Sequence, residues 1–70
     1  MRKYLVVYKK TKTGYSAYVP DLPGVIARQN KKIIEKNIFD AINFHLQGLK
    51  EEKLRIPKAS AESEVFVFAV

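Results

Sequence analysis

The chain has 70 residues, a formal net charge of +6 and no cysteine. A chain of this length forms one domain, residues 1–70, with a thin core, because it buries only about 60% of the surface that its unfolded form exposes. The lack of cysteine excludes a disulfide framework and thiolate chemistry.

We expect no targeting segment in the N-terminal stretch. Its apolar run, Tyr4–Tyr8, is too short for a signal peptide or a membrane span. We therefore expect a cytoplasmic protein that does not enter a membrane.

Two strands are predicted in the first part of the chain. Residues Lys3 to Tyr8 are mostly apolar, and Tyr15 to Val19 are rich in aromatic and β-branched residues, as in a pleated sheet. A polar turn that ends in Gly14 separates them, which predicts a β-hairpin.

A corner follows the second strand. Pro20 ends the strand because it has no N–H for the hydrogen-bond ladder. Asp21 is expected to cap the turn through its own side chain, and Pro23-Gly24 supplies a fixed φ followed by a permissive one. Leu22 has two interpretations: it projects between the prolines as a contact, or it plugs the end of the core.

A third strand, Val25 to Arg28, and a long helix are predicted next. Asn30 is a suitable N-cap for a helix that runs to about Glu52. Its apolar stripe contains Ile34, Ile38, Ala41, Ile42, His45 and Leu49. Ile33 and Phe44 lie off this stripe and are expected to be exposed. Gly48 inside the helix suggests close packing at that position.

The C-terminal run Glu64 to Val70 is predicted to form a fourth strand after a loop over Lys53 to Ser63. The fold is then α+β, β-β-β-α-β, with sheet order 3-2-1-4 and one helix on one face. The last strand is apolar on both faces, with Val65, Val67 and Ala69 on one side and Phe66, Phe68 and Val70 on the other. One helix covers only one face, so we predict a homodimer or higher homo-oligomer.

Gly14–Gly24, Gly-Tyr-Ser-Ala-Tyr-Val-Pro-Asp-Leu-Pro-Gly, resembles the signature of the HicB-like antitoxin family. Asn37–Leu49 is similar to the family's helix pattern Asn-Ile-x-x-Ala-Ile-x-x-x-Leu-x-x-Leu, and the likeness extends from about Arg2 to Pro57. The opening of the helix, Arg28–Lys32, departs from the family by being basic.

The resemblance implies a truncated ribonuclease H-like fold in a single HicB-like domain. It also implies a toxin–antitoxin system in which the chain binds and blocks a HicA-type toxin, a small ribonuclease that cleaves messenger RNA. The DNA-binding segment of full-length antitoxins is not expected in this chain.

No enzymatic activity is predicted, with no catalytic, metal-binding or cofactor-binding residues. His45 is the single histidine, and on the apolar stripe it is interpreted as a packed side chain, because no nucleophile or orienting acid is indicated near it.

Two functional hypotheses therefore stand. The first is a protein-binding module that contacts its partner through the corner, at Tyr18, Pro20, Asp21, Leu22 and Pro23. The alternative is a small basic nucleic-acid-binding protein that uses the cluster Lys9, Lys10 and Lys12 and stacks bases on Tyr4, Tyr8, Tyr15 and Tyr18.

Overall fold

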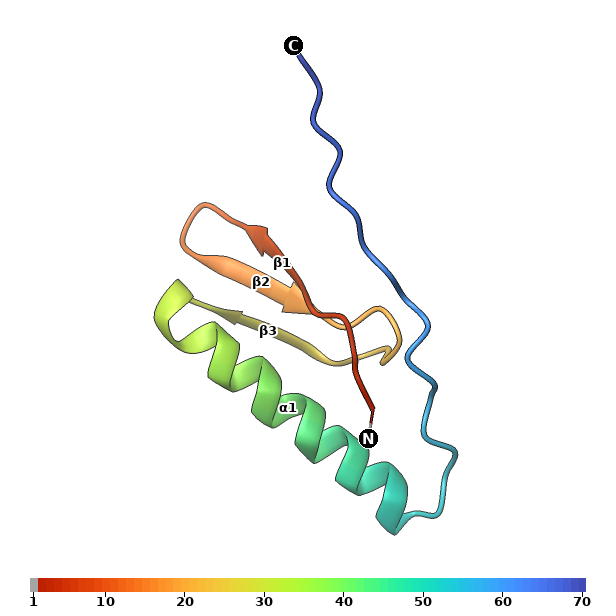
Figure 1. Ribbon diagram of the computed structural model, residues 1–70. Helices are drawn as coiled ribbons and strands as arrows, with labels where there is room; N and C mark the ends of the chain where they lie inside the picture. The colour runs from red at the N-terminus through yellow and green to blue at the C-terminus, as the bar shows by residue number, and fades with distance from the viewer. Residues whose placement is uncertain (1) are drawn as a thin grey trace.

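A computed structural model, which describes residues 2–70, shows a three-stranded sheet packed on one helix (Figure 1). The strands are β1 (Val7–Lys10), β2 (Tyr15–Tyr18) and β3 (Ile26–Gln29), followed by the helix α1 (Lys31–Glu51). Both strand pairs are antiparallel, and the sheet order is β1-β2-β3. The α+β class, the three-stranded meander and the single long helix are thus confirmed.

The first strand begins later than the predicted Lys3. The turn closes through a hydrogen bond from the Thr11 N–H to the Gly14 carbonyl, at 2.8 Å, and the register pairs Lys10 with Tyr15. Strand β2 has only four residues between Gly14 and the corner, so only four residues of the first segment find a ladder partner. Residues 2–6 therefore leave the sheet.

The helix begins where its cap predicts. The Asn30 Oδ1 accepts hydrogen bonds from the backbone N–H groups of Lys32, at 3.0 Å, and Ile33, at 3.3 Å. Such a cap satisfies two of the amides that a helix leaves unpaired at its start. Ile33 and Phe44 are 43% and 82% exposed, which confirms that they lie off the buried stripe.

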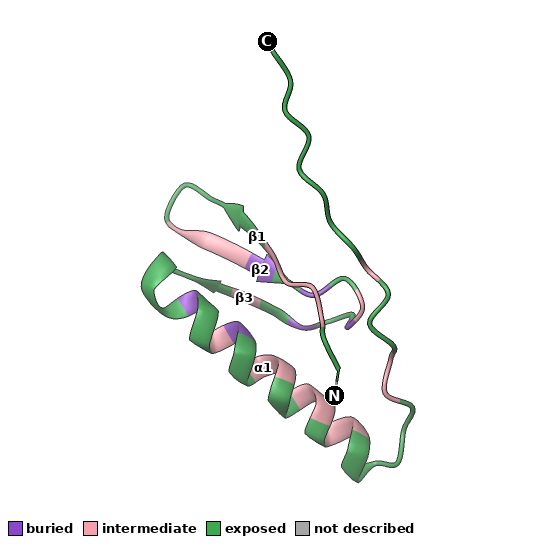
Figure 2. Cartoon of the chain, in the orientation of Figure 1, coloured by how far each residue is buried: buried purple, intermediate pink, exposed green. Residues whose placement is uncertain are grey.

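The core lies between β2, the corner and the first half of α1 (Figure 2). Six buried residues form it: Ala17, Val19, Leu22, Val25, Ile34 and Ile38. The helix packs on β2 and β3, and its backbone lies farther from β1. The flank of the helix that lies beyond β2 faces Tyr4, Val6 and Tyr8 across a hollow.

The predicted fourth strand is not formed in this structure. Residues Glu64 to Val70 are extended and exposed, and they project from the body of the molecule (Figure 1). A strand is stabilised by a backbone partner and a buried face, and within residues 2–70 this segment has neither. The sheet consequently has three strands rather than the four of order 3-2-1-4.

Two glycines have opposite surroundings. A Cβ added at Gly14 would lie 2.7 Å from the Gln29 carbonyl oxygen, so this turn approaches the end of β3 too closely for any side chain. A Cβ added at Gly48 would meet nothing within 4 Å. The expectation of close packing at Gly48 was therefore wrong.

This contrast gives a matched pair of substitutions. Gly48→Ala should raise the free energy of unfolding by about 0.5–1 kcal/mol, because alanine has the higher helix propensity and here fits without a clash. Gly14→Ala should lower it, because the Gln29 backbone would have to move away. Thermal unfolding of the two variants beside the parent chain tests both signs, and a destabilised Gly48→Ala would show that this helix face is packed.

Candidate functional site

The corner between β2 and β3 is a rigid turn built from backbone hydrogen bonds. The Leu22 N–H donates to the Val19 carbonyl at 3.0 Å, and the Val25 N–H donates to the Leu22 carbonyl at 3.2 Å. Gly24 has a φ of +88°, which only glycine adopts without strain. The sequence Pro-Asp-Leu-Pro-Gly thus fixes the chain reversal without help from another element.

Leu22 does not project from this corner. It has no exposed surface and packs in the core with Val19 and Val25, so it plugs the open end between sheet and helix. The corner residues that face solvent are Pro20 and Pro23, together with Tyr18 at the end of β2, which is 46% exposed. A partner that docks on the corner would meet these three side chains.

Truncating the plug should weaken the fold. Leu22→Ala removes a fully buried side chain at the centre of a small core, which typically costs about 2–5 kcal/mol of unfolding free energy. Chemical denaturation of this variant measures the loss. Pro23→Ala, at an exposed neighbouring position, is the control, and an equal loss in both variants would argue against the plug.

Asp21 binds a distant segment rather than its own turn. Its Oδ2 accepts hydrogen bonds from the backbone N–H groups of Ser60 and Ala61, and its Oδ1 accepts from the Ser60 hydroxyl, each at 2.9 Å. The predicted role as a turn cap is therefore wrong. Ser60 and Ala61 were not singled out in the sequence because small polar loop residues carry no pattern that identifies their partner. We call this arrangement the Asp21 clamp.

The clamp lowers the pKa of the Asp21 carboxyl below its ordinary value of 3.8, because the Ala61 and Ser60 N–H groups stabilise the charged form. A folded-state pKa below the unfolded value means that the stabilisation is present above pH 3.8 and is lost as the pH falls through the lowered pKa.

Acidification should therefore release the C-terminal segment. The Ser60 and Ala61 amides should exchange with solvent faster as the pH falls from neutral to about 2, beyond the intrinsic pH dependence of free amides. Asp21→Asn should show fast exchange of these amides already at neutral pH. Identical profiles in the parent and Asp21→Asn chains would mean that the clamp does not hold the segment in solution.

The face of the sheet opposite the helix carries two cross-strand rows. Val7, Tyr18 and Ile26 are direct neighbours across the three strands, and Tyr18 and Ile26 are 46% and 60% exposed. The next row, also outward, consists of Lys9, Ser16 and Arg28. We call this surface the outer face; it combines an apolar row with a basic one, and sequence analysis identified only Tyr18 and Lys9 on it.

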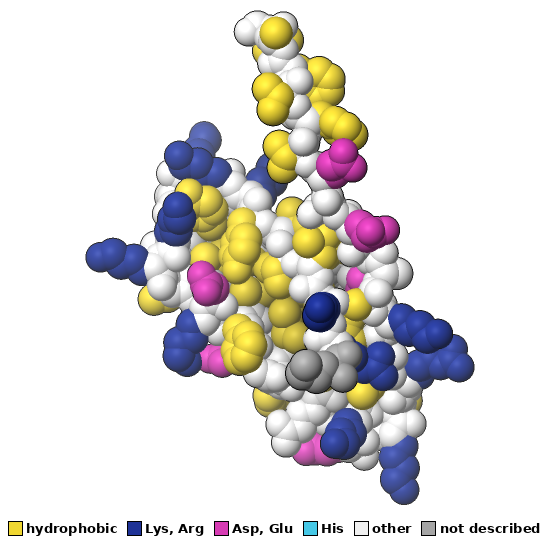
Figure 3. All heavy atoms as spheres, viewed as in Figure 1, with side chains coloured by type: hydrophobic (Ala, Val, Ile, Leu, Met, Phe, Trp, Pro, Cys, Tyr) yellow, Lys and Arg dark blue, Asp and Glu magenta, His cyan; other side chains and the backbone are white. Residues whose placement is uncertain are grey.

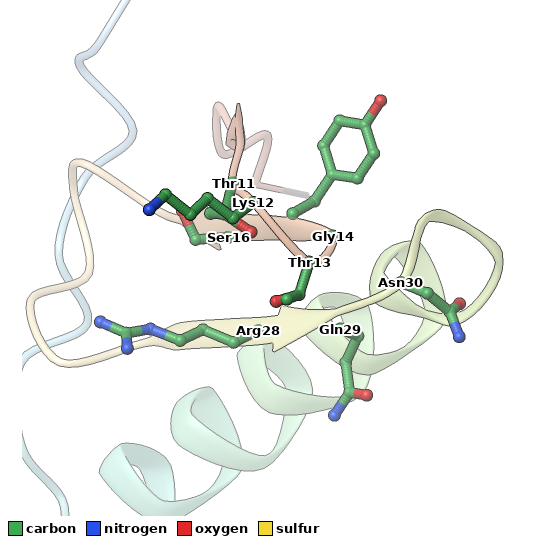
Figure 4. Close-up of a pocket in the computed structure, with 9 residues that line it drawn as sticks. Thr11, Lys12, Thr13, Gly14, Ser16, Arg28, Gln29 and Asn30 are labelled. Carbon is green, nitrogen blue, oxygen red and sulfur yellow. The ribbon is translucent and has the colours of Figure 1, made fainter.

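A polar hollow of about 650 Å³ lies between the β1–β2 turn and the junction of β3 with α1 (Figure 4). Lys12 from the turn and Arg28 from β3 extend in the same direction along it, while Asn30 lies on the other side (Figure 4). The neighbouring Tyr15 ring is covered by the Lys31 ammonium, 5.9 Å from the ring centre. The hollow can attract an anion electrostatically, but its charges sit on long, exposed side chains.

His45 is half-buried on α1 and lines an apolar groove with Phe44, Leu49 and Leu54. Within residues 2–70, no three histidine, aspartate or glutamate side chains are close enough to hold a metal ion.

The C-terminal residues form the most apolar exposed segment of the molecule. We call Glu64–Val70 the tail. Its large side chains Val65, Phe66, Val67, Phe68 and Val70 are between 69% and 120% exposed. Figure 3 shows these apolar side chains on both sides of a segment that stands away from the rest of the chain. Exposed apolar surface of this extent usually marks an interaction site.

Comparison of the sequence with models of known families, with curated proteins and with solved structures finds no match. The helix in residues 2–70 is not apolar enough to cross a membrane. The geometry of the corner, the outer face and the tail therefore carries the functional argument.

Proposed function

We propose that this chain is a non-catalytic protein-binding module of the HicB antitoxin type, which works in the cytoplasm and blocks a HicA-type mRNA-cleaving toxin without a DNA-binding segment. The observation that carries the proposal is the open outer face, whose apolar row Val7, Tyr18 and Ile26 ends at the rigid corner. The resemblance of Gly14–Gly24 to the HicB signature supplies the partner class.

The corner is well suited to hold a partner because it is already ordered. Pro20 and Pro23 have restricted backbones, and Leu22 fixes the turn from inside the core. A contact built on such a turn loses little conformational entropy on binding. Tyr18 adds a large amphipathic side chain of the kind that is enriched at interfaces.

The same proposal includes a complete sheet and self-association. The tail would lie along a free β1 edge, its own or that of a second copy, as a fourth strand, which gives the order 3-2-1-4 of a truncated ribonuclease H-like fold. The homo-oligomer would cover apolar surface that a single chain leaves exposed. The apolar tail and the free β1 edge support both parts.

Inhibition of a purified HicA-type ribonuclease tests the function. The parent chain should block cleavage of a messenger RNA substrate when it is added in equimolar amount. The double variant Tyr18→Ser and Ile26→Ser should inhibit at least about tenfold less well, since it removes the centre of the apolar row. Ile33→Ser is the control, because Ile33 is exposed in the first turn of the helix and is not among the residues that line the groove with Ile26.

The three outcomes are distinct. Weak inhibition by the outer-face variant, with its unfolding temperature unchanged and Ile33→Ser fully active, supports the contact. Full inhibition by both variants places the contact elsewhere. No inhibition by the parent chain, at concentrations well above those of the toxin, contradicts the antitoxin function.

Nucleic-acid binding is the second candidate, favoured by the basic row Lys9 and Arg28 beside the hollow that Lys12 lines. The positions of the tyrosines allow only a limited role for them in base stacking. Tyr8 and Tyr18 are exposed, but their cross-strand partners place them on opposite faces of the sheet, and Tyr4 donates its hydroxyl proton to the Pro57 carbonyl.

Binding of single-stranded RNA at two salt concentrations tests this candidate. If binding is electrostatic, the affinity for RNA should fall about tenfold or more between low and moderate salt. The double variant Lys12→Gln, Arg28→Gln should lower both this affinity and its salt dependence. Phe44→Ser, which changes neither a basic residue nor a tyrosine, is the control. RNA binding that is undetectable at low salt would exclude this function.

A further inference from the structure

The edge of β1 is a vacant pairing site. The sheet order places β1 at one side, with β2 as its only ladder partner among the described residues. Its outward N–H and C=O groups are therefore free to pair with another extended segment. The tail is such a segment, because it is extended, apolar and, within residues 2–70, not part of any sheet.

An apolar hollow adjoins this edge. It measures about 300 Å³ and lies between the β1 side of the sheet and α1, with Tyr4, Tyr8, Phe39, Ile42 and Leu46 among its lining residues. Phe39 is 63% exposed and Tyr8 is 44% exposed. A strand added to β1 would extend the sheet over this flank of the helix, and every second side chain would enter the hollow.

The Asp21 clamp leaves the tail little spare length to reach its own β1 edge. The Asp21 clamp fixes Ala61 at the connection between β2 and β3. From there to a position outside β1 is about two and a half strand spacings, or roughly 12 Å. The four steps from Ala61 to Val65 span at most about 14 Å when fully extended. Residues 61–65 would have to be almost fully extended across the end of the sheet.

We propose that the tail pairs with the β1 edge of a second copy of the chain, and that two copies exchange their tails reciprocally. Each copy has one free tail and one free edge, so a two-fold arrangement satisfies both. Phe66 and Phe68 enter the partner's aromatic-lined hollow, while Val65 and Val67 extend the outer face. This inference goes beyond the proposed function and does not depend on the identity of a toxin.

The area involved is sufficient for a stable dimer. A buried phenylalanine covers about 150–250 Å², so the four phenylalanines of two tails contribute roughly 600–1,000 Å². The two hollows that receive them lose a comparable area, which brings the total into the range of about 1,200–2,000 Å² of stable interfaces.

Sedimentation equilibrium at micromolar concentration tests the exchange in the full chain. The parent should have twice the 8.0 kDa mass of one chain. Val67→Pro removes an N–H and blocks strand pairing, so it should be monomeric with an unchanged helix signal. Val67→Thr keeps the N–H and should remain dimeric.

A second pair of variants probes the hollow. Phe39→Ser should weaken dimerisation at least about tenfold, because Phe39 borders the hollow beside β1. Phe44→Ser changes a phenylalanine that is even more exposed, at 82% against 63%, on the groove side of the same helix, and it should leave the dimer intact. Retention of the dimer in both Val67→Pro and Phe39→Ser overturns the proposal, as does a monomeric parent.

Cross-linking decides whose tail is bound, and the chain has no cysteine of its own to interfere. Chains carrying Lys9→Cys are mixed with chains carrying Val67→Cys and treated with a flexible bismaleimide. Exchange predicts a covalent product that contains one chain of each kind. The double variant Lys9→Cys, Val67→Cys is treated in the same way. If it is linked only within single chains and the mixture gives no mixed product, the tail folds back on its own β1 and exchange is excluded.

Discussion

One helix must cover a sheet that is wider than the surface the helix can reach. Helix α1 packs on β2 and β3, and the buried side chains lie on β2, in the corner and in the first half of the helix. The flank beside β1 therefore keeps half-buried and exposed aromatic residues, including Tyr8 and Phe39. A core this small leaves the chain dependent on what fills that flank.

The corner links the small core to the C-terminal segment. Leu22 closes one end of the core from inside, and Asp21, the preceding residue, holds Ser60 and Ala61 on the outside. One turn thus stabilises the sheet–helix unit and also fixes the point from which the tail leaves. The direction of the tail, and hence its access to a neighbouring chain, is set by three hydrogen bonds to one carboxylate.

Much of the fold could be predicted from local patterns. Asn30 caps the helix through its own side chain, the 3.6-residue period identifies Ile34 and Ile38 as buried, and the turn residues define the hairpin and the corner. Each of these features depends on residues close together in sequence. The exposure of Ile33 and Phe44 followed from the same period.

The parts that could not be predicted depend on distant partners. The run Glu64–Val70 has the composition of a strand, but composition does not say which backbone it pairs with or whether that backbone belongs to the same chain. Asp21 was assigned to its own turn because nothing in the sequence indicated Ser60 and Ala61 as partners. Likewise, the outer face appears only when the register places Val7 beside Tyr18 and Ile26.

The central claim is that the apolar tail completes the sheet of another copy. Amide hydrogen exchange of Val65 to Val70, followed over a dilution series, tests it most directly. Protection of these amides should be strong at high protein concentration and should disappear on dilution, while the amides of β2, within the sheet of one chain, stay protected throughout. Tail protection that is independent of concentration, or absent at every concentration, would contradict the account.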